Sequence, residues 1–230
     1  MNMKMLVVQH NDVEGPGYIA DWAKNHNYEV KIVRPDKGDS LKAIRPEQLD
    51  FLVVMGGDES ANDMDKDWIS DERHLIQRVH AQKKPILGVC LGAQQIAKAM
   101  GALIFKGTTA EIGWLPVKKS AQNPIDDVPD QMTVLHWHQD QFTLPVDSKR
   151  LFKTKLDHNQ GFIMGNMMGL QFHFEVTPDE VKKLTKTDAG FIKASDAPNA
   201  VQQTADQINQ HDFPKNNQKV LDKLIDQIVK

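Results

Sequence analysis

Short apolar runs alternate with amphipathic stretches along the first hundred residues. The runs that predict strands cover residues 3–9, 28–33, 49–55 and 85–89. The stretches that repeat apolar side chains at helical spacing cover residues 18–25, 68–82 and 91–100. Because strands and helices alternate, this half predicts an α/β fold, with a mostly parallel central sheet flanked by helices on both faces.

The second half of the chain has a different pattern, with short strand-like runs separated by turn residues. These runs cover residues 104–105, 115–118, 133–137, 151–155, 161–164 and 169–174. We expect them to extend the sheet or to form extra antiparallel strands beside it. From Thr177 the pattern is polar and helical, and it ends in an amphipathic segment over residues 220–229 that we expect to pack on the domain itself. The sequence therefore predicts a single domain over residues 1–230, with a core of about residues 1–180 and a C-terminal helical extension over residues 181–230.

Charge and cysteine content narrow the class of protein. The chain has 28 basic and 31 acidic residues, spread evenly, and a net charge of −3. It lacks the basic footprint of a nucleic-acid binder and of a polybasic membrane anchor, so we expect neither partner. The apolar run Met5–Val8 is too short for a signal peptide or a membrane span. A single cysteine excludes an intrachain disulfide, which is typical of a reducing compartment. We therefore expect a cytoplasmic protein.

The segment Gly88-Val-Cys90-Leu-Gly92 lies between a predicted strand and a predicted helix. This is the cysteine form of the nucleophile elbow, in which glycines allow a sharp turn and a close approach of neighbouring backbone. The turn would place the sulfur at a helix N-terminus, where the helix dipole is expected to lower the pKa of the thiol. We interpret Cys90 as a nucleophile; the alternative is a small buried residue between two elements.

His173 and Glu175 lie at the end of a strand-like run in the second half. Residues two apart in a strand point to the same face, so the carboxylate can orient the imidazole while its other nitrogen faces a nucleophile. Alone the pair is a weak signal, but with the elbow it predicts a base and its orienting group.

Two segments together resemble a known family. They are Gly88-Val-Cys90-Leu-Gly-Ala-Gln94 and, about eighty residues later, Gln171-Phe-His173-Phe-Glu175-Val-Thr177. They are similar to the class I (triad) glutamine amidotransferases, particularly to stand-alone members related to the amidotransferase domain of GMP synthase. The resemblance extends to about Pro178 and includes Gly56-Gly57, Glu111-Ile-Gly-Trp114 and His136-Trp-His-Gln-Asp140.

The resemblance implies roles for particular residues. Cys90, His173 and Glu175 would form the catalytic triad, and the backbone N–H groups of Gly57 and Leu91 would form the oxyanion hole. The residues that would contact the substrate are Gln94, Trp137, His138, Gln139 and Asp140. Two positions depart from the family pattern. Phe174 replaces the usual proline between the triad histidine and glutamate, and Gln139 replaces a usual glycine beside the substrate loop.

The family resemblance implies an amidohydrolase that releases ammonia from glutamine through a γ-glutamyl thioester, with a separate synthase as the possible acceptor. The alternatives are a γ-glutamyl peptidase, favoured by a more open pocket near Gln139 and Asp58, and a non-catalytic regulatory subunit. No metal or organic cofactor is expected. His136-x-His138-x-Asp140 also resembles a run of metal ligands in other hydrolases, but the final histidine of that run is Gln141 here. The oligomeric state stays open.

Overall fold

The computed structural model describes the backbone of residues 2–194 and 201–230, and it contains every strand and helix predicted for the first hundred residues. These elements are β1 (Met3–Val8), α1 (Gly17–Asn25), β2 (Tyr28–Val33), β3 (Phe51–Val54), α2 (Asp67–Ala81), β4 (Ile86–Val89) and α3 (Leu91–Ala99). Their ends differ from the predicted ones by at most two residues. Three short 3₁₀ turns, at Pro35–Lys37, Leu41–Ala43 and Pro46–Gln48, connect β2 to β3.

The second half adds β5 (Ile104–Lys119), β6 (Gln131–Phe142), β7 (Lys149–Lys153), β8 (Gly161–Met164), β9 (Met167–Leu170) and β10 (Val201–Gln202). The runs predicted at residues 104–105 and 115–118 are in fact parts of one long strand, β5. Gly107 and Gly113, which lie between these runs, resemble turn residues. Instead, β5 pairs with β6 along its length, and the pairing shifts register between Lys106 and Glu111, as at a β-bulge.

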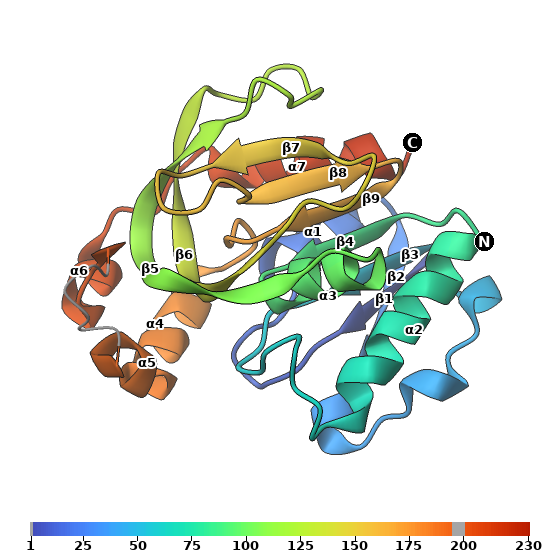
Figure 1. The fold of residues 1–230 in the computed structure, drawn as a ribbon. Helices are drawn as coiled ribbons and strands as arrows, with labels where there is room; N and C mark the ends of the chain where they lie inside the picture. The colour runs from blue at the N-terminus through green and yellow to red at the C-terminus, as the bar shows by residue number, and fades with distance from the viewer. Residues whose placement is uncertain (1, 195–200) are drawn as a thin grey trace.

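All strands within the described residues belong to one mixed sheet. Its first part is parallel, in the order β2–β1–β3–β4–β9. Its second part is antiparallel and continues from β9 through β8, β7 and β5 to β6. Strand β10 adds a short parallel pairing to β5. Figure 1 shows β5 and β6 curving away from the parallel part, so the predicted α/β class with antiparallel strands in the second half is confirmed.

The remaining helices are α4 (Pro178–Thr187), α5 (Ala189–Ala194), α6 (Ala205–Gln210) and α7 (Asn217–Ile228). Helix α4 begins at a capping box, in which Thr177 accepts from the Glu180 backbone N–H and Glu180 accepts from that of Thr177. Helices α4 to α6 gather beside β5 and β6 (Figure 1), where an apolar cluster includes Trp114, Trp137 and Leu184.

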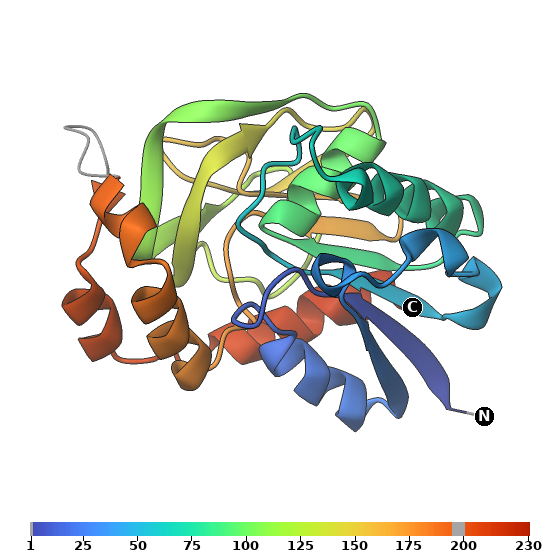
Figure 2. The ribbon, with the colours of Figure 1, turned by 90° about the horizontal axis from the view of Figure 1, so that it is seen from below.

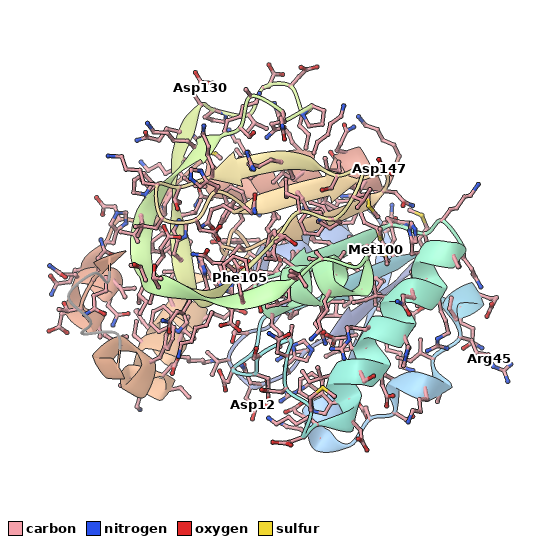
Figure 3. The ribbon with its side chains drawn as sticks, viewed as in Figure 1. Asp12, Arg45, Met100, Phe105, Asp130 and Asp147 are labelled. Carbon is pink, nitrogen blue, oxygen red and sulfur yellow. The ribbon has the colours of Figure 1, made fainter. Side chains whose placement is uncertain are left out.

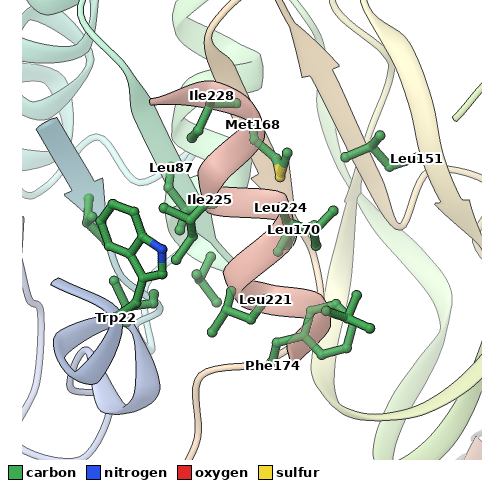
Figure 4. Packing of buried hydrophobic residues seen from close by; sticks show 14 of the residues in the cluster. Trp22, Leu87, Leu151, Met168, Leu170, Phe174, Leu221, Leu224, Ile225 and Ile228 are labelled. Carbon is green, nitrogen blue, oxygen red and sulfur yellow. The ribbon is translucent and has the colours of Figure 1, made fainter. Parts of the chain in front are cut away.

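Two larger clusters lie on the two faces of the parallel part of the sheet. Helices α1 and α7 cover one face and α2 and α3 cover the other, as the two views agree (Figures 1 and 2). Figure 4 shows Leu221, Leu224 and Ile225 of α7 packing toward Trp22 of α1 and Leu87 of β4. The expectation that the C-terminal amphipathic segment packs on its own domain is thus confirmed. The division into a core of about residues 1–180 and an extension stays a prediction.

Charged side chains point outward around the molecule, as Asp12, Arg45, Asp130 and Asp147 do in Figure 3. Within the described residues, the helices are all too short or too polar to span a bilayer.

Candidate active site

Cys90 lies between the last residue of β4 and the first residue of α3, at the carboxyl edge of the parallel sheet. Its backbone has φ of 51° and ψ of −110°, a conformation that residues other than glycine rarely adopt. A Cβ on Gly88 would lie 2.4 Å from the carbonyl oxygen of Gly92, and a Cβ on Gly92 would lie 2.0 Å from that of Val54. The strained, glycine-dependent turn predicted from the sequence is therefore present.

His173 and Glu175 lie next to this turn and are each 1% exposed. The Nδ1 of His173 is 2.7 Å from Oε1 of Glu175. On the other side of the ring, Nε2 of His173 is left free of Glu175, and the ring interacts with the Cys90 thiol. Apart from this thiol, Nε2 has no hydrogen-bond partner among residues 2–194 and 201–230. The three side chains are thus arranged in the order that a nucleophile, a base and an orienting carboxylate require.

The predicted reason for this pairing was wrong, although the pairing itself is present. Strand β9 ends at Leu170, before either residue. Residues 171–175 leave the sheet edge, and the N–H of His173 donates to the Leu135 carbonyl of β6 in an isolated bridge. The apolar pattern alone does not show that β9 ends before His173, because residues 171–175 remain buried after the strand has ended.

Burial is the largest influence on the pKa of the Cys90 thiol. It raises the pKa of the thiol, and the opposing effects of His173 and of the Leu91 backbone N–H do not cancel it. The N–H of Leu91 at the helix N-terminus does lower this pKa, as predicted, but burial outweighs it, so the expected net lowering was wrong. Burial also acts to lower the pKa of His173, but the charge of Glu175 and the neighbouring Cys90 raise it well above 6.5. Burial thus opposes ionisation of the Cys90 thiol, while Glu175 and Cys90 raise the affinity of His173 for a proton.

Phe174, the residue between His173 and Glu175, is 1% exposed. Its ring lies 4.9 Å from that of Phe172 and 6.3 Å from that of Phe152, centroid to centroid. Figure 4 shows it beside helix α7. The side chain fills the core while the His173–Glu175 hydrogen bond stays short, so the absence of proline does not disorient the carboxylate.

Cys90 opens onto a cavity of about 440 Å³. Gly57 and Leu91 line it together, and a Cβ on Gly57 would lie 3.0 Å from Cδ2 of Leu91. Leu91 is the first residue of α3, where a backbone N–H has no partner within the helix. The two backbone segments expected to hold an oxyanion therefore meet beside the sulfur.

The other side chains expected to contact substrate also line this cavity. Gln94 donates to the Asp140 carbonyl at 3.4 Å and to Oε1 of Gln171 at 3.2 Å. The Asp140 carboxylate accepts from the Ser60 hydroxyl at 2.8 Å, and the Gln139 amide donates to the Gly107 carbonyl at 3.0 Å. Gln139 is thus tied to β5.

Trp137 and His138 contribute to the cavity in different ways. The Trp137 carbonyl accepts from the Cys90 thiol at 3.8 Å, whereas its indole N–H donates to Asp188 at 2.6 Å. The Nε2 of His138 points to the Glu111 carboxylate, 3.4 Å away. The backbone of Trp137 therefore faces the sulfur of Cys90, and both side chains are held by other groups.

A family model, Glutamine amidotransferase class-I, matches residues 18–190 of the chain. The chain belongs to this family. The amidotransferase-like protein YfeJ of Salmonella typhimurium is 29% identical over 191 residues, 79% of this chain and 80% of that protein. Gamma-glutamyl peptidase 4 of Arabidopsis thaliana is 28% identical over 67% of this chain and 68% of its own length. A glutamine-hydrolysing GMP synthase subunit from Thermoplasma acidophilum is 31% identical over 64% of this chain and 72% of its own length.

The fold agrees with solved amidotransferases. The crystal structure of a glutamine amidotransferase from Thermotoga maritima superposes with a TM-score of 0.88 at 28% identity, over 100% of this chain and 99% of that one. The family and these relatives are consistent with a hydrolase that acts on carbon–nitrogen bonds.

Two functional candidates in this amidotransferase site were missed from the sequence, and both follow β1. Glu14 lines the cavity beside Cys90, and its Oε1 accepts from Asn11 at 2.9 Å. Burial raises the pKa of Glu14. His10 holds the loop that contains Gly57, because its Nδ1 lies 2.9 Å from the Gly56 carbonyl. The carboxyl ends of parallel strands lie along one edge of the sheet, so the residues that follow β1 lie near Cys90, which follows β4. This position is the signal in the sequence that points to His10 and Glu14.

His10 predicts a pH-dependent stability. Its Nε2 lies 2.7 Å from the Glu72 carboxylate, and both side chains are fully buried. Burial opposes protonation, but Glu72 raises the pKa of His10 from 6.5 to about 9. Charged His10 therefore stabilises the fold below pH 6.5, and this stabilisation is lost as the pH rises toward 9. At about 1.4 kcal/mol per pH unit, the free energy of unfolding should fall by roughly 3 kcal/mol in that window.

Urea unfolding at several pH values between 6 and 10 measures this effect. In His10→Gln the fall over this window should be smaller by about the His10 contribution, while the share from His173, whose pKa is also raised, stays the same in both proteins. Equal slopes in the variant and the wild-type protein would contradict the assignment.

Proposed function

We propose that the protein is a cysteine-nucleophile amidohydrolase that cleaves the side-chain amide of glutamine or of a related γ-glutamyl compound. Cys90 transfers its proton to Nε2 of His173 and its sulfur forms a bond with the amide carbon. The oxyanion accepts from the N–H groups of Gly57 and Leu91. His173 then gives the proton to the leaving nitrogen as the carbon–nitrogen bond breaks, and a γ-glutamyl thioester remains.

The second half of the reaction reuses the same groups. Water gives a proton to His173 and attacks the thioester carbon, the thiol leaves with the proton returned by His173, and glutamate is released. Glu175 holds the imidazole and stabilises its charged form in both halves. This chemistry requires no cofactor.

One observation carries the proposal: a buried histidine, oriented by Glu175 at 2.7 Å, adjoins a sulfur that sits on a strained turn at the end of a cavity. The high pKa of His173 suits a base that must deprotonate a buried thiol. Gln94 and the segment Trp137–Asp140 line the same cavity and are placed to hold the γ-glutamyl group.

A γ-glutamyl peptidase is the second candidate, and the size of the cavity favours it. At about 440 Å³ it falls in the range of pockets that hold ligands larger than one amino acid, roughly 300–1,000 Å³. The Gln139 amide donates to the Gly107 carbonyl, and Asp58 lines the same cavity; a leaving group larger than ammonia would lie between them. The likeness to gamma-glutamyl peptidase 4 supports the same reading.

For the glutaminase reading, an ammonia acceptor would be a synthase on another chain, as the likeness to part of a GMP synthase suggests. We place the protein in the cytoplasm, where glutamine and a reduced Cys90 are both available. A regulatory protein without activity is the least supported alternative, because the groups that the reaction needs are assembled.

Release of ammonia and glutamate from L-glutamine, and of glutamate from γ-glutamyl dipeptides, tests the proposal. We expect the wild-type protein to turn over at least one of these classes. Turnover of dipeptides but not of glutamine would assign a peptidase, and Gln139→Gly should then change KM for dipeptides more than kcat. A protein inactive on both classes, alone and with added synthase subunits, would contradict the proposal.

A further inference from the structure

Two histidines and a glutamate meet where β5 pairs with β6, outside the triad. His136 and His138 lie two residues apart on β6 and share a face of the strand, and Glu111 is the partner of His138 in β5. One ligand atom of each residue lies within 4.8 Å of the others, and all three residues are buried. The ligand run suggested by the sequence ended at Asp140, but the Asp140 carboxylate instead accepts from Ser60. The third candidate ligand is therefore Glu111 and not Asp140.

His136 has no apparent structural use for its polar atoms. The side chain is 0% exposed, and neither Nδ1 nor Nε2 has a hydrogen-bond partner in the part of the chain that the structure describes. Buried polar groups are almost always paired, so an imidazole with both nitrogens unpaired needs an explanation. A metal ion bound to one nitrogen would supply it.

His138 is oriented as a metal ligand. Its Nδ1 faces the Asp140 carbonyl at 3.3 Å, so a hydrogen on Nδ1 leaves the lone pair of Nε2 directed at Glu111. Metal-binding histidines commonly have their other ring nitrogen fixed in this way. The Nε2 of His138 and Oε2 of Glu111 are 3.4 Å apart. Two ligands of a tetrahedral zinc ion, each about 2.0–2.2 Å from the metal, are separated by roughly this distance.

Gln160 offers a fourth ligand. Its Nε2 donates to Oε2 of Glu111 at 2.5 Å and lies 3.3 Å from Nε2 of His138. Its buried Oε1 has no partner among the described residues. Turning the amide over would place this oxygen beside the other ligand atoms. The two arrangements of an amide are distinguished only by their hydrogen bonds.

We propose that Glu111, His136 and His138 bind one Zn²⁺ ion, with the amide oxygen of Gln160 or water as the fourth ligand. The donor set of two imidazoles and one carboxylate is one that zinc takes in proteins. The ion would pin β5 to β6 just after the register shift between Lys106 and Glu111. Because His138 also lines the cavity of Cys90, the ion would hold the segment expected to contact substrate.

Glu111 also lines a second cavity of about 510 Å³, through which a metal ion could reach the site from solvent. Lys118, Lys153 and Lys155 line the same cavity. Their positive charge slows the approach of a cation, so binding has to be measured at equilibrium.

Zinc binding by the chain of residues 1–230, prepared without a tag, tests the proposal, with Cys90→Ala as the host so that no thiolate competes for the metal. After equilibrium dialysis, we expect one zinc per chain and a rise in the thermal unfolding midpoint. His136→Asn in the same host should weaken binding by more than about 100-fold and remove the rise, since even loss of an outer-shell partner lowers affinity about 10- to 100-fold. The matched control is His158→Gln, an exposed histidine near Glu111 in the second cavity, which should bind zinc like the host.

Three outcomes would overturn the site: no zinc in the host, equal binding by His136→Asn, or loss of binding in His158→Gln alone. Should His136→Asn fail to fold, Co²⁺ in the host gives an independent answer. A visible absorption spectrum of tetrahedral cobalt supports the site, and a spectrum of octahedral aqueous cobalt contradicts it.

Discussion

Cys90→Ala should lower kcat/KM for the favoured γ-glutamyl substrate by a factor on the order of 10⁵–10⁶. The triad of a nucleophilic hydrolase acts as a unit, and loss of its nucleophile alone removes nearly all of its contribution. His173 and Glu175 then have no group to activate, and water cannot occupy the attacking position of the sulfur at the end of β4 without rearrangement. Steady-state release of ammonia or of glutamate measures the loss.

The same variant should keep its fold, which separates loss of chemistry from loss of structure. The thiol donates to the Trp137 carbonyl at 3.8 Å and accepts from the Gln171 amide at 3.7 Å, and both hydrogen bonds are long and weak. The free energy of unfolding should therefore change by about 1 kcal/mol or less. Activity within tenfold of the wild-type protein in a folded Cys90→Ala variant would exclude Cys90 as the nucleophile.

Glu175→Gln should lower kcat by roughly 10²- to 10⁴-fold with little change in substrate binding. An amide can present its N–H to Nδ1 of His173, which would favour the wrong tautomer, with the hydrogen on Nε2 facing the sulfur. The variant also loses the charge that raises the pKa of His173. That pKa falls, so the acid limb of the kcat/KM profile should move to lower pH.

The full pH–rate profile distinguishes this positioning role from a structural one. Glu29→Gln, which makes the same change at an exposed position on β2, is the matched control and should match the wild-type protein. A Glu175→Gln variant that folds, with unchanged kcat and an unshifted acid limb, would show that Glu175 does not orient the base.

Much of this site could be predicted because local pattern and spacing determine it. The elbow requires Gly88 and Gly92 within a few residues of Cys90, and both close approaches are present. Strands β3 and β4 were visible as apolar runs because they are buried on both faces. Pairing of His173 with Glu175 was predicted from their separation of two residues, although the backbone that achieves it is not a strand.

The remaining features depend on contacts between distant segments, which a single sequence does not show. The pKa of Cys90 is set by burial under β6 and its neighbours more than by the helix that follows it. His10 and Glu72 are sixty-two residues apart, and Glu111 reaches His136 and His138 only through the pairing of β5 with β6. Strand β5 was divided in the prediction because its glycines resemble turn signals when the partner strand is unknown.

Mass spectrometry of the protein, quenched in acid within milliseconds of mixing with substrate, tests the central claim most directly. The chain has one cysteine, so a γ-glutamyl thioester can form at only one position. We predict a γ-glutamyl adduct on the peptide that contains Cys90, present during turnover and absent in Cys90→Ala. Rapid turnover with no adduct at any quench time, together with activity retained in Cys90→Ala, would contradict the account.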